Sequence, residues 1–160
     1  MSERRNPNRR AALASALPAA YQQLLGMNKL VEEAAAEAGL DPKLVELIKI
    51  RASQLNGCAF CLDMHSRDAR DKAGEDERRL YVLPAWRETT FFTEQEQAAL
   101  ALTEAMTNLP SHHDVPDEIY DRAADAFTAQ QLTAVVWLAG VINLFNRFGV
   151  TGRMPLPSRP

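Results

Sequence analysis

The sequence is short of the features that mark secreted, membrane-spanning or nucleic-acid-binding proteins. Its 160 residues include only two cysteines, which is too few for the disulfide framework of a small secreted domain. A membrane span needs about 18 to 20 apolar residues, and the nearest run, over 132–145, is interrupted by Thr133 and Asn143. The net charge is −3 with both signs scattered along the chain, so we expect neither nucleic acid nor a membrane as partner.

The N-terminus is basic but does not resemble a secretory signal. Residues 1–10 hold four arginines and one glutamate, and the small-residue run after them is weakly apolar and contains Pro18. That run passes directly into an amphipathic helical pattern, whereas a signal peptide needs a strongly apolar segment. We therefore predict a basic tail over 1–16, one helical domain over 17–150, a C-terminal tail over 151–160 and a cytoplasmic location.

The chain also lacks a convincing strand, and its turn and cap signals divide it into about seven helices. The clearest signals are Asp41-Pro42, which opens a helix, and two capping boxes that begin at Thr93 and Thr128. We expect loops over 84–92 and 108–115. The fold class predicted is all-α, in a single compact multi-helix domain. The expected helices run from near Pro18 to Ala38, from Pro42 to Asn56, from Gly57 to before Gly74, over Glu75–Leu83, from Glu94 through Met106, from Pro116 onward and from Ala129 onward.

The last helix is apolar around most of its circumference. Val135, Trp137, Leu138, Val141 and Ile142 do not share one face, which is typical of a helix buried on all sides. In a domain this small, such a helix would serve both the core and a contact with another subunit. We therefore expect a homo-oligomer.

The two cysteines form a Cys58-x-x-Cys61 motif, with His65 four residues later. Around a helix axis, Cys61 lies about 60° from Cys58, and His65 lies only about 20° from Cys58. All three side chains therefore share one face of the helix. Residues three apart are about 5 to 6 Å from each other, within disulfide range. A helix start or a histidine lowers a thiol pKa to roughly 3.5 to 7.5. Here the helix start would act mainly on Cys58 and His65 mainly on Cys61.

Such a pair supports a redox cycle in which one thiolate reduces a peroxide and becomes a sulfenic acid, and the other closes a disulfide. An external dithiol then restores both thiols by exchange. Glu46, on the preceding helix, is a candidate to orient His65 and hold its tautomer. The alternative for Glu46 is an ordinary solvated helix residue.

The pattern of Glu46, eleven residues, Cys58-x-x-Cys61, three residues and His65 resembles the AhpD-like alkylhydroperoxidases of the carboxymuconolactone decarboxylase superfamily. The stretch from Arg51 to His65, together with residues 86–94, extends the resemblance, which covers about 18–148. It implies an all-α fold assembled as trimers, dimers or hexamers, and peroxide reduction at the CxxC. It also implies that Cys61, nearer the histidine, becomes the sulfenic acid and Cys58 the proton donor and resolving thiol. The best-known peroxidase members carry a histidine where this chain has Phe60.

We therefore predict a thiol-dependent peroxidase with Cys61, Cys58, His65 and Glu46 as catalytic residues. We predict no cofactor and no metal, a peroxide substrate, and a lipoyl- or thioredoxin-type dithiol as reductant. A zinc shell built from the same four residues, or a pair of inert core cysteines, are the structural alternatives. The functional alternatives are lactone decarboxylase chemistry, which needs no CxxC, and a non-catalytic redox sensor. His112 and His113 are expected in a polar surface loop.

Overall fold

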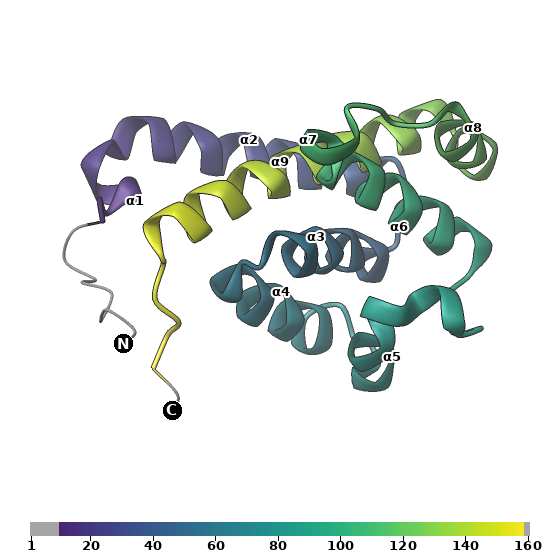
Figure 1. Cartoon of the computed structure of the whole chain (residues 1–160), viewed down its shortest axis with the longest axis horizontal. Coiled ribbons are helices and arrows are strands. Elements are labelled where there is room, and N and C mark those ends of the chain that lie inside the picture. The colour runs from purple at the N-terminus through teal and green to yellow at the C-terminus, as the bar shows by residue number, and fades with distance from the viewer. Residues whose placement is uncertain (1–9, 159–160) are drawn as a thin grey trace.

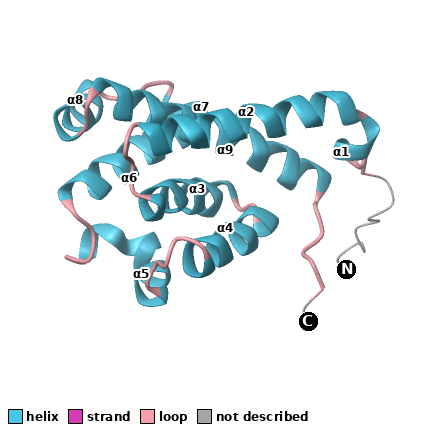
Figure 2. Ribbon diagram, turned by 180° about the vertical axis from the view of Figure 1, so that it is seen from behind, coloured by secondary structure: helices cyan, strands magenta, loops and turns pink. Residues whose placement is uncertain are grey.

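The structure is a computed structural model that describes residues 10–158, and all the regular secondary structure there is helical (Figures 1 and 2). The all-α prediction is confirmed. Residues 1–9 of the expected N-terminal tail and residues 159–160 lie outside the described part of the chain. In order, the helices are α1 (Leu13–Ala16), α2 (Pro18–Glu37), α3 (Pro42–Asn56), α4 (Ala59–Asp71), α5 (Glu77–Val82), the 3-10 helix η2 (Leu83–Glu88), α6 (Glu94–Thr107), α7 (Leu109–His112), α8 (Asp117–Ala126) and α9 (Ala129–Gly152).

The predicted cap signals set the helix limits. The Asp41 carboxylate accepts a hydrogen bond from the backbone N–H of Lys43 at 2.9 Å, at the start of α3. Thr93 and Thr128 each form a complete capping box, at the starts of α6 and α9. These caps satisfy N–H groups that a helix leaves without partners in its first turn, which is why the boundaries could be read from sequence.

Two segments expected as loops contain short helices. Residues 83–88 form η2, and 109–112 form α7. Pro84 and Pro110 each lie in the first turn of these helices, where the fixed φ of proline favours helical geometry and its missing N–H costs nothing. His112 ends α7 and His113 follows it, and both are exposed, so the predicted surface position of the two histidines is confirmed.

Helix α3 lies at the centre of the molecule, packed against α9, α4 and α6, while α2 runs alongside α9 (Figure 1). Leu44 and Ile48 contribute to one buried cluster with side chains of α2, α6 and α9. Leu47 and Ile50 contribute to a second, with side chains that include Leu83, Trp86 and Leu100. Because α3 is held from two sides, the polar side chains that it carries have fixed positions.

Helix α9 has one buried face and one exposed face. Val135 and Leu138 are buried in the core, but Trp137, Leu144 and Phe148 are 53%, 37% and 39% exposed. In the single chain α9 is therefore buried only on the side that packs against α2, α3, α4 and α6, and its contact with another subunit stays a prediction. By length and composition alone α9 could cross a membrane, but its packing is that of a core helix.

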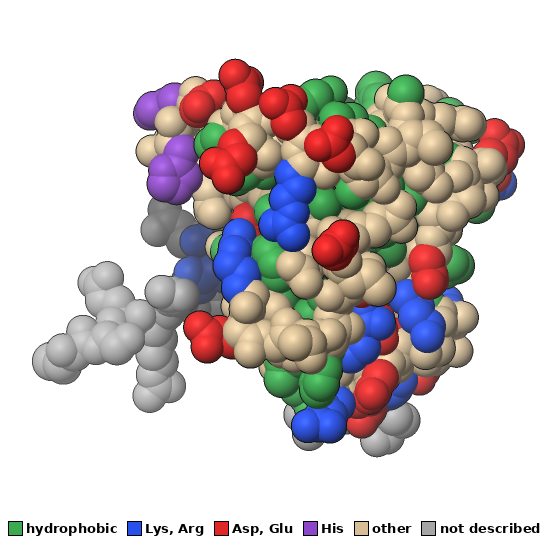
Figure 3. All heavy atoms as spheres, turned by 90° about the vertical axis from the view of Figure 1, so that its right-hand side faces the viewer, with side chains coloured by type: hydrophobic (Ala, Val, Ile, Leu, Met, Phe, Trp, Pro, Cys, Tyr) green, Lys and Arg blue, Asp and Glu red, His purple; other side chains and the backbone are tan. Residues whose placement is uncertain are grey.

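The surface around α8 is rich in carboxylates, as the upper part of the face in Figure 3 shows. A hollow there is lined by Glu94, Glu118, Asp121, Asp125 and Arg122. These side chains are exposed, so the face is a solvated charged surface rather than an enclosed site.

Candidate dithiol active site

The two cysteines lie at the junction of α3 and α4 and are joined in a disulfide. Gly57 ends α3 in the left-handed conformation, with φ at +68°, which turns the chain directly into α4. Cys58 is the N-cap of α4, and its sulfur accepts the backbone N–H of Cys61 at 3.3 Å. The Cα atoms are 5.4 Å apart. The first turn of α4 therefore brings the two sulfurs together, as the spacing predicted.

Both sulfurs are covered by the last turns of α9. Cys58 is 1% and Cys61 3% exposed. A Cβ atom at Gly149 would lie 2.7 Å from the Cys58 sulfur and 3.6 Å from that of Cys61. The backbone of α9 thus lies so close to the disulfide that a residue with a side chain would not fit at position 149.

His65 and Glu46 form a buried pair beside this disulfide. His65 is 8% exposed and lies one turn beyond Cys61 on α4. Its Nδ1 is 2.9 Å from Oε2 of Glu46, which lies on α3. An ionised carboxylate can only accept a hydrogen bond, so Nδ1 carries the proton and Nε2 is left free to act as a base. The alternative in which Glu46 is a solvated residue is wrong, because its side chain is 14% exposed and fully engaged.

The surroundings of Glu46 keep it ionised. Burial alone raises the pKa of its carboxyl group, but the hydrogen bond from His65 and the positive charge of Lys49 outweigh burial, so the pKa lies below its ordinary value. Lys49 itself lies one turn along α3, with its ammonium 3.3 Å from Oε1 of Glu46.

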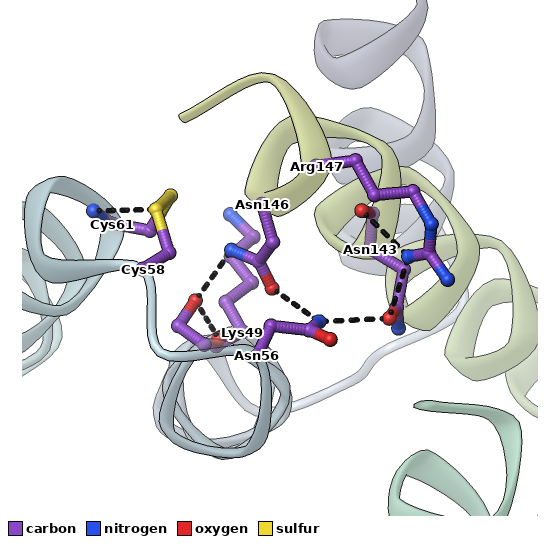
Figure 4. The surroundings of a disulfide bond; sticks show 8 residues. Lys49, Asn56, Cys58, Cys61, Asn143, Asn146 and Arg147 are labelled. Atoms are coloured by element: carbon purple, nitrogen blue, oxygen red, sulfur yellow. Dashed lines mark hydrogen bonds between the residues drawn. A yellow bond between two sulfur atoms is a disulfide. The ribbon is translucent and has the colours of Figure 1, made fainter. Parts of the chain in front are cut away.

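A network of amides connects α9 to the end of α3, next to the disulfide (Figure 4). The Asn56 side-chain amide donates to the side-chain oxygens Oδ1 of Asn143 and Asn146, at 2.9 Å each. Asn146 donates to the hydroxyl of Ser53 at 2.9 Å, and Arg147 donates to Asn143. The polar residues of this helix therefore bond one another, the backbone of α9 and side chains of α3. The network also fixes the part of α9 that carries Gly149.

The four predicted residues are brought together, but not in the arrangement of a metal site. Within residues 10–158, no group of three or more His, Cys, Asp or Glu side chains is arranged to hold a metal ion. The sulfurs bond each other, and the Glu46 oxygens are taken by His65 and Lys49.

Three residues of the site were not anticipated: Lys49, Asn56 and Gly149. Lys49 follows Glu46 at the i, i+3 spacing of an ion pair, so a signal for it was present in the sequence. For Asn56 the sequence indicates only the end of a helix, since its partners lie about 90 residues away. Gly149 has no such signal, because an isolated glycine in a helix does not say what approaches it.

Comparison with known proteins agrees with this geometry. The model of the carboxymuconolactone decarboxylase family matches residues 18–105, which include the whole CxxC, His65 and Glu46 site. The chain belongs to the carboxymuconolactone decarboxylase family. Within that superfamily it is an AhpD-like member, as the sequence pattern predicted.

Two uncharacterized proteins and one solved structure are similar to this chain over most of its length. The Bacillus subtilis protein YdfG, which is uncharacterized, is 44% identical over 120 residues, 75% of this chain and 80% of its own. The uncharacterized Escherichia coli protein YnjA is 34% identical over 116 residues, 72% of this chain but 62% of its own length. A crystal structure from Agrobacterium tumefaciens, ATU0492, has a TM-score of 0.83 at 32% identity and covers 94% of this chain and 99% of its own. ATU0492 is of unknown function, with a suggested assignment as antioxidant defence protein AhpD.

The fold also occurs in an enzyme with different chemistry. The debrominase Bmp8 matches with a TM-score of 0.77 at 19% identity, over 90% of this chain and 74% of its own. At that identity the likeness concerns the fold alone, and a shared fold does not imply a shared function.

Proposed function

We propose that this protein is a thiol-dependent peroxidase that reduces hydrogen peroxide or organic hydroperoxides through a Cys58–Cys61 dithiol/disulfide cycle. The observation that carries the proposal is the buried His65–Glu46 pair one helical turn beyond the disulfide. A base held in one tautomer beside a thiol is what a thiol needs in order to react as a thiolate at neutral pH.

In the first step, His65 Nε2 takes the proton of Cys61, and the thiolate attacks the terminal oxygen of the peroxide. The O–O bond breaks and Cys61 becomes a sulfenic acid. The leaving alkoxide takes the proton that His65 holds and departs as an alcohol. In the second step the Cys58 sulfur attacks Cys61, the S–O bond breaks, and water leaves. A dithiol of the lipoyl or thioredoxin type then reduces the disulfide by exchange. The sum is one peroxide and one external dithiol converted to an alcohol, water and an external disulfide.

One feature supports Cys61 as the attacking sulfur, and another favours Cys58. Cys61 precedes His65 by one turn of α4. The two side chains therefore lie on the same face of the helix, where His65 can take the thiol proton of Cys61. Cys58 occupies the N-cap, where its sulfur accepts a backbone N–H; this also favours a thiolate, so the two roles need a direct test.

The test compares Cys61→Ser with Cys58→Ser, each the matched control of the other. We expect both variants to lose peroxide-dependent consumption of dithiol. Cys58→Ser should retain a sulfenic acid on Cys61 that a dimedone-type reagent traps, whereas Cys61→Ser should give no adduct. An adduct on Cys58 in Cys61→Ser would exchange the two roles.

The same assay separates the proposal from its alternatives. A peroxidase consumes many equivalents of dithiol for each chain, whereas a redox sensor is oxidised once and stops. Lactone chemistry would persist in both serine variants because it does not use the sulfurs. A wild-type protein that takes up one equivalent of peroxide without turnover would remove the proposed function.

A further inference from the structure

Lys49 is a buried lysine that the proposed chemistry does not yet use. It is 3% exposed, on the central helix α3. Lysine is almost never buried to this degree unless its charge is paired, because burial disfavours the ammonium form. The ammonium of Lys49 contacts two carboxylates, Glu46 on its own helix and Glu32 on α2.

The two oxygens of the Glu46 carboxylate have different partners. Oε1 faces the Lys49 ammonium at 3.3 Å, and Oε2 faces Nδ1 of His65 at 2.9 Å. The carboxylate is therefore held from both ends, and its rotation away from His65 would break the ion pair with Lys49. Glu32, which is 42% exposed, holds the ammonium from the solvent side.

Lys49 also separates two like charges. Without it, the Glu32 and Glu46 carboxylates would share one site with no cation between them. Two carboxylates in such a position cannot both remain ionised easily, and the pKa of one of them rises. Because Glu46 is the more buried of the two, it is the one that would take the proton.

Other charged groups near the pair do not replace Lys49. Asp68 on α4 and Lys72, the residue just after α4, bind each other at 2.9 Å. Lys72 is 75% exposed, so its charge acts on Glu46 and Glu32 only at a distance and through solvent, without a contact to either. The charges that α6 and α9 bring to α3 are engaged elsewhere, Glu104 with Arg51 and Arg147 with Asn143. A hollow of about 290 Å³ opens to solvent at this place, lined in part by Glu32, Glu46, Lys49, Asp68 and Lys72.

We propose that Lys49 is a positioning residue whose ammonium keeps the Glu46 carboxylate ionised and turned toward His65, so that Nε2 of His65 remains the free base beside the CxxC. The use of that base on a peroxide rests on the proposed function. The state of His65 does not, and it can be measured without peroxide.

The experiment compares Lys49→Met and Lys49→Arg with Lys29→Met, a control that removes an exposed lysine from α2. Two readouts on the reduced protein are followed against pH: the ¹⁵N shifts of the His65 ring and the rate of alkylation of the CxxC by iodoacetamide. In the wild type and in Lys29→Met, Nδ1 should carry the proton and Nε2 should not.

In Lys49→Met, protonation of Glu46 at neutral pH should move the ring proton toward Nε2. Alkylation at pH 7 should fall about tenfold, the change in thiolate for one unit of thiol pKa, and recover at higher pH. Lys49→Arg should keep the wild-type tautomer and rate, because it keeps the charge. In the double variant Glu32→Gln/Lys49→Met the like charges no longer compete, so part of the loss should be restored.

Wild-type ring shifts and alkylation in Lys49→Met would overturn the proposal, and so would an equal loss in Lys49→Arg. If Lys49→Met does not fold, the test is made with Glu32→Gln alone. In that variant Lys49 keeps its ion pair with Glu46, so the Nδ1–H tautomer of His65 should persist. Its loss in Glu32→Gln would overturn the proposal. A wild type that lacks peroxide turnover, combined with the tautomer change in Lys49→Met, would remove the proposed function and keep the role of Lys49.

Discussion

Two carboxylates of this protein are buried to the same degree but have neighbours of different chemistry. The side chain of Glu46 is 14% exposed and that of Glu104 12%. Glu104, on α6, accepts hydrogen bonds from Arg51 at 2.7 Å, Trp86 at 2.8 Å and Arg87 at 2.6 Å. As with Glu46, burial raises the pKa of Glu104, and its donors, led by Trp86, outweigh that effect and hold the pKa below its usual range.

The difference lies in what the partners can do with a proton. An arginine guanidinium and a tryptophan indole stay protonated at any pH at which the protein is folded, so the Glu104 cluster can only brace α3, η2 and α6. Glu46 instead faces the Nδ1 of a histidine, whose second ring nitrogen is a possible proton acceptor. Burial and a lowered pKa therefore do not identify a catalytic carboxylate, whereas the chemistry of its partners does.

The sharpest test of this comparison removes one partner from each carboxylate. We expect His65→Gln to lower peroxide turnover by roughly 10²- to 10⁴-fold, the usual contribution of a positioned base. Trp86→Phe should retain turnover, since Glu104 keeps Arg51 and Arg87. Steady-state consumption of dithiol measures both. Losses of similar size in the two variants would show that the distinction between the two carboxylates is false.

A second test replaces the carboxylates themselves. Glu46→Gln and Glu104→Gln should each lower the free energy of unfolding at pH 7 by about 1–3 kcal/mol, because charged donors lose an ionised acceptor. Only Glu46→Gln should also slow turnover, and its loss should not add to that of His65→Gln, because both act through one pair. Denaturant unfolding and the turnover assay provide the two readings.

The stability loss should depend on pH with a defined sign. Both carboxyl groups have a pKa lower in the folded than in the unfolded chain, so their contribution is complete above the ordinary glutamate pKa of about 4.3. It is lost as the pH falls through the lower folded value. The gap between the wild type and each glutamine variant should therefore close in acid, and a gap independent of pH would contradict the assigned ionisation.

The smallest expected effect on turnover concerns the outer surface of α9, the helix whose last turns cover the disulfide. We propose that its exposed apolar face, with Met27 and Leu30 of α2, contacts another copy of the chain. Trp137 lies beside an apolar hollow of about 460 Å³ on this face and is 53% exposed. Trp137→Glu should weaken assembly by about 2 kcal/mol or more, as expected for a central tryptophan.

The matched control is Tyr81→Glu on α5, where the aromatic residue is 72% exposed. Light scattering should give a mass above 17.8 kDa for the wild type and the control, and a smaller mass for Trp137→Glu. A wild-type mass of 17.8 kDa would show a monomer and would contradict the proposed contact between copies at α9.

The parts of this molecule that depend on local sequence were predictable. Of the contacts between separate helices, only the Glu46–His65 pair was predicted, from the residue pattern that resembles the family. The caps at Asp41, Thr93 and Thr128 act within one helical turn, so their signals are complete in the sequence. The Cys58 and Cys61 spacing is local in the same sense. The approach of Gly149 to Cys58 joins residues far apart in the chain, and no local pattern encodes it. Lys49 is intermediate, since its bond to Glu46 is local and its bond to Glu32 is not.

The glycine at position 149 has a consequence for the order of events in a catalytic cycle. At Gly149 the main chain of α9 lies directly over the sulfurs, and a backbone cannot swing aside by changing a rotamer. A peroxide of a few atoms and a bulky dithiol carrier therefore place unequal demands on the same entrance. In the cycle proposed above, the oxidising half-reaction would need only a narrow passage, whereas the reducing half-reaction would need the last turns of α9 to shift before a foreign sulfur could reach Cys58 or Cys61. The speed of the whole cycle would then be set by how often that helix end opens.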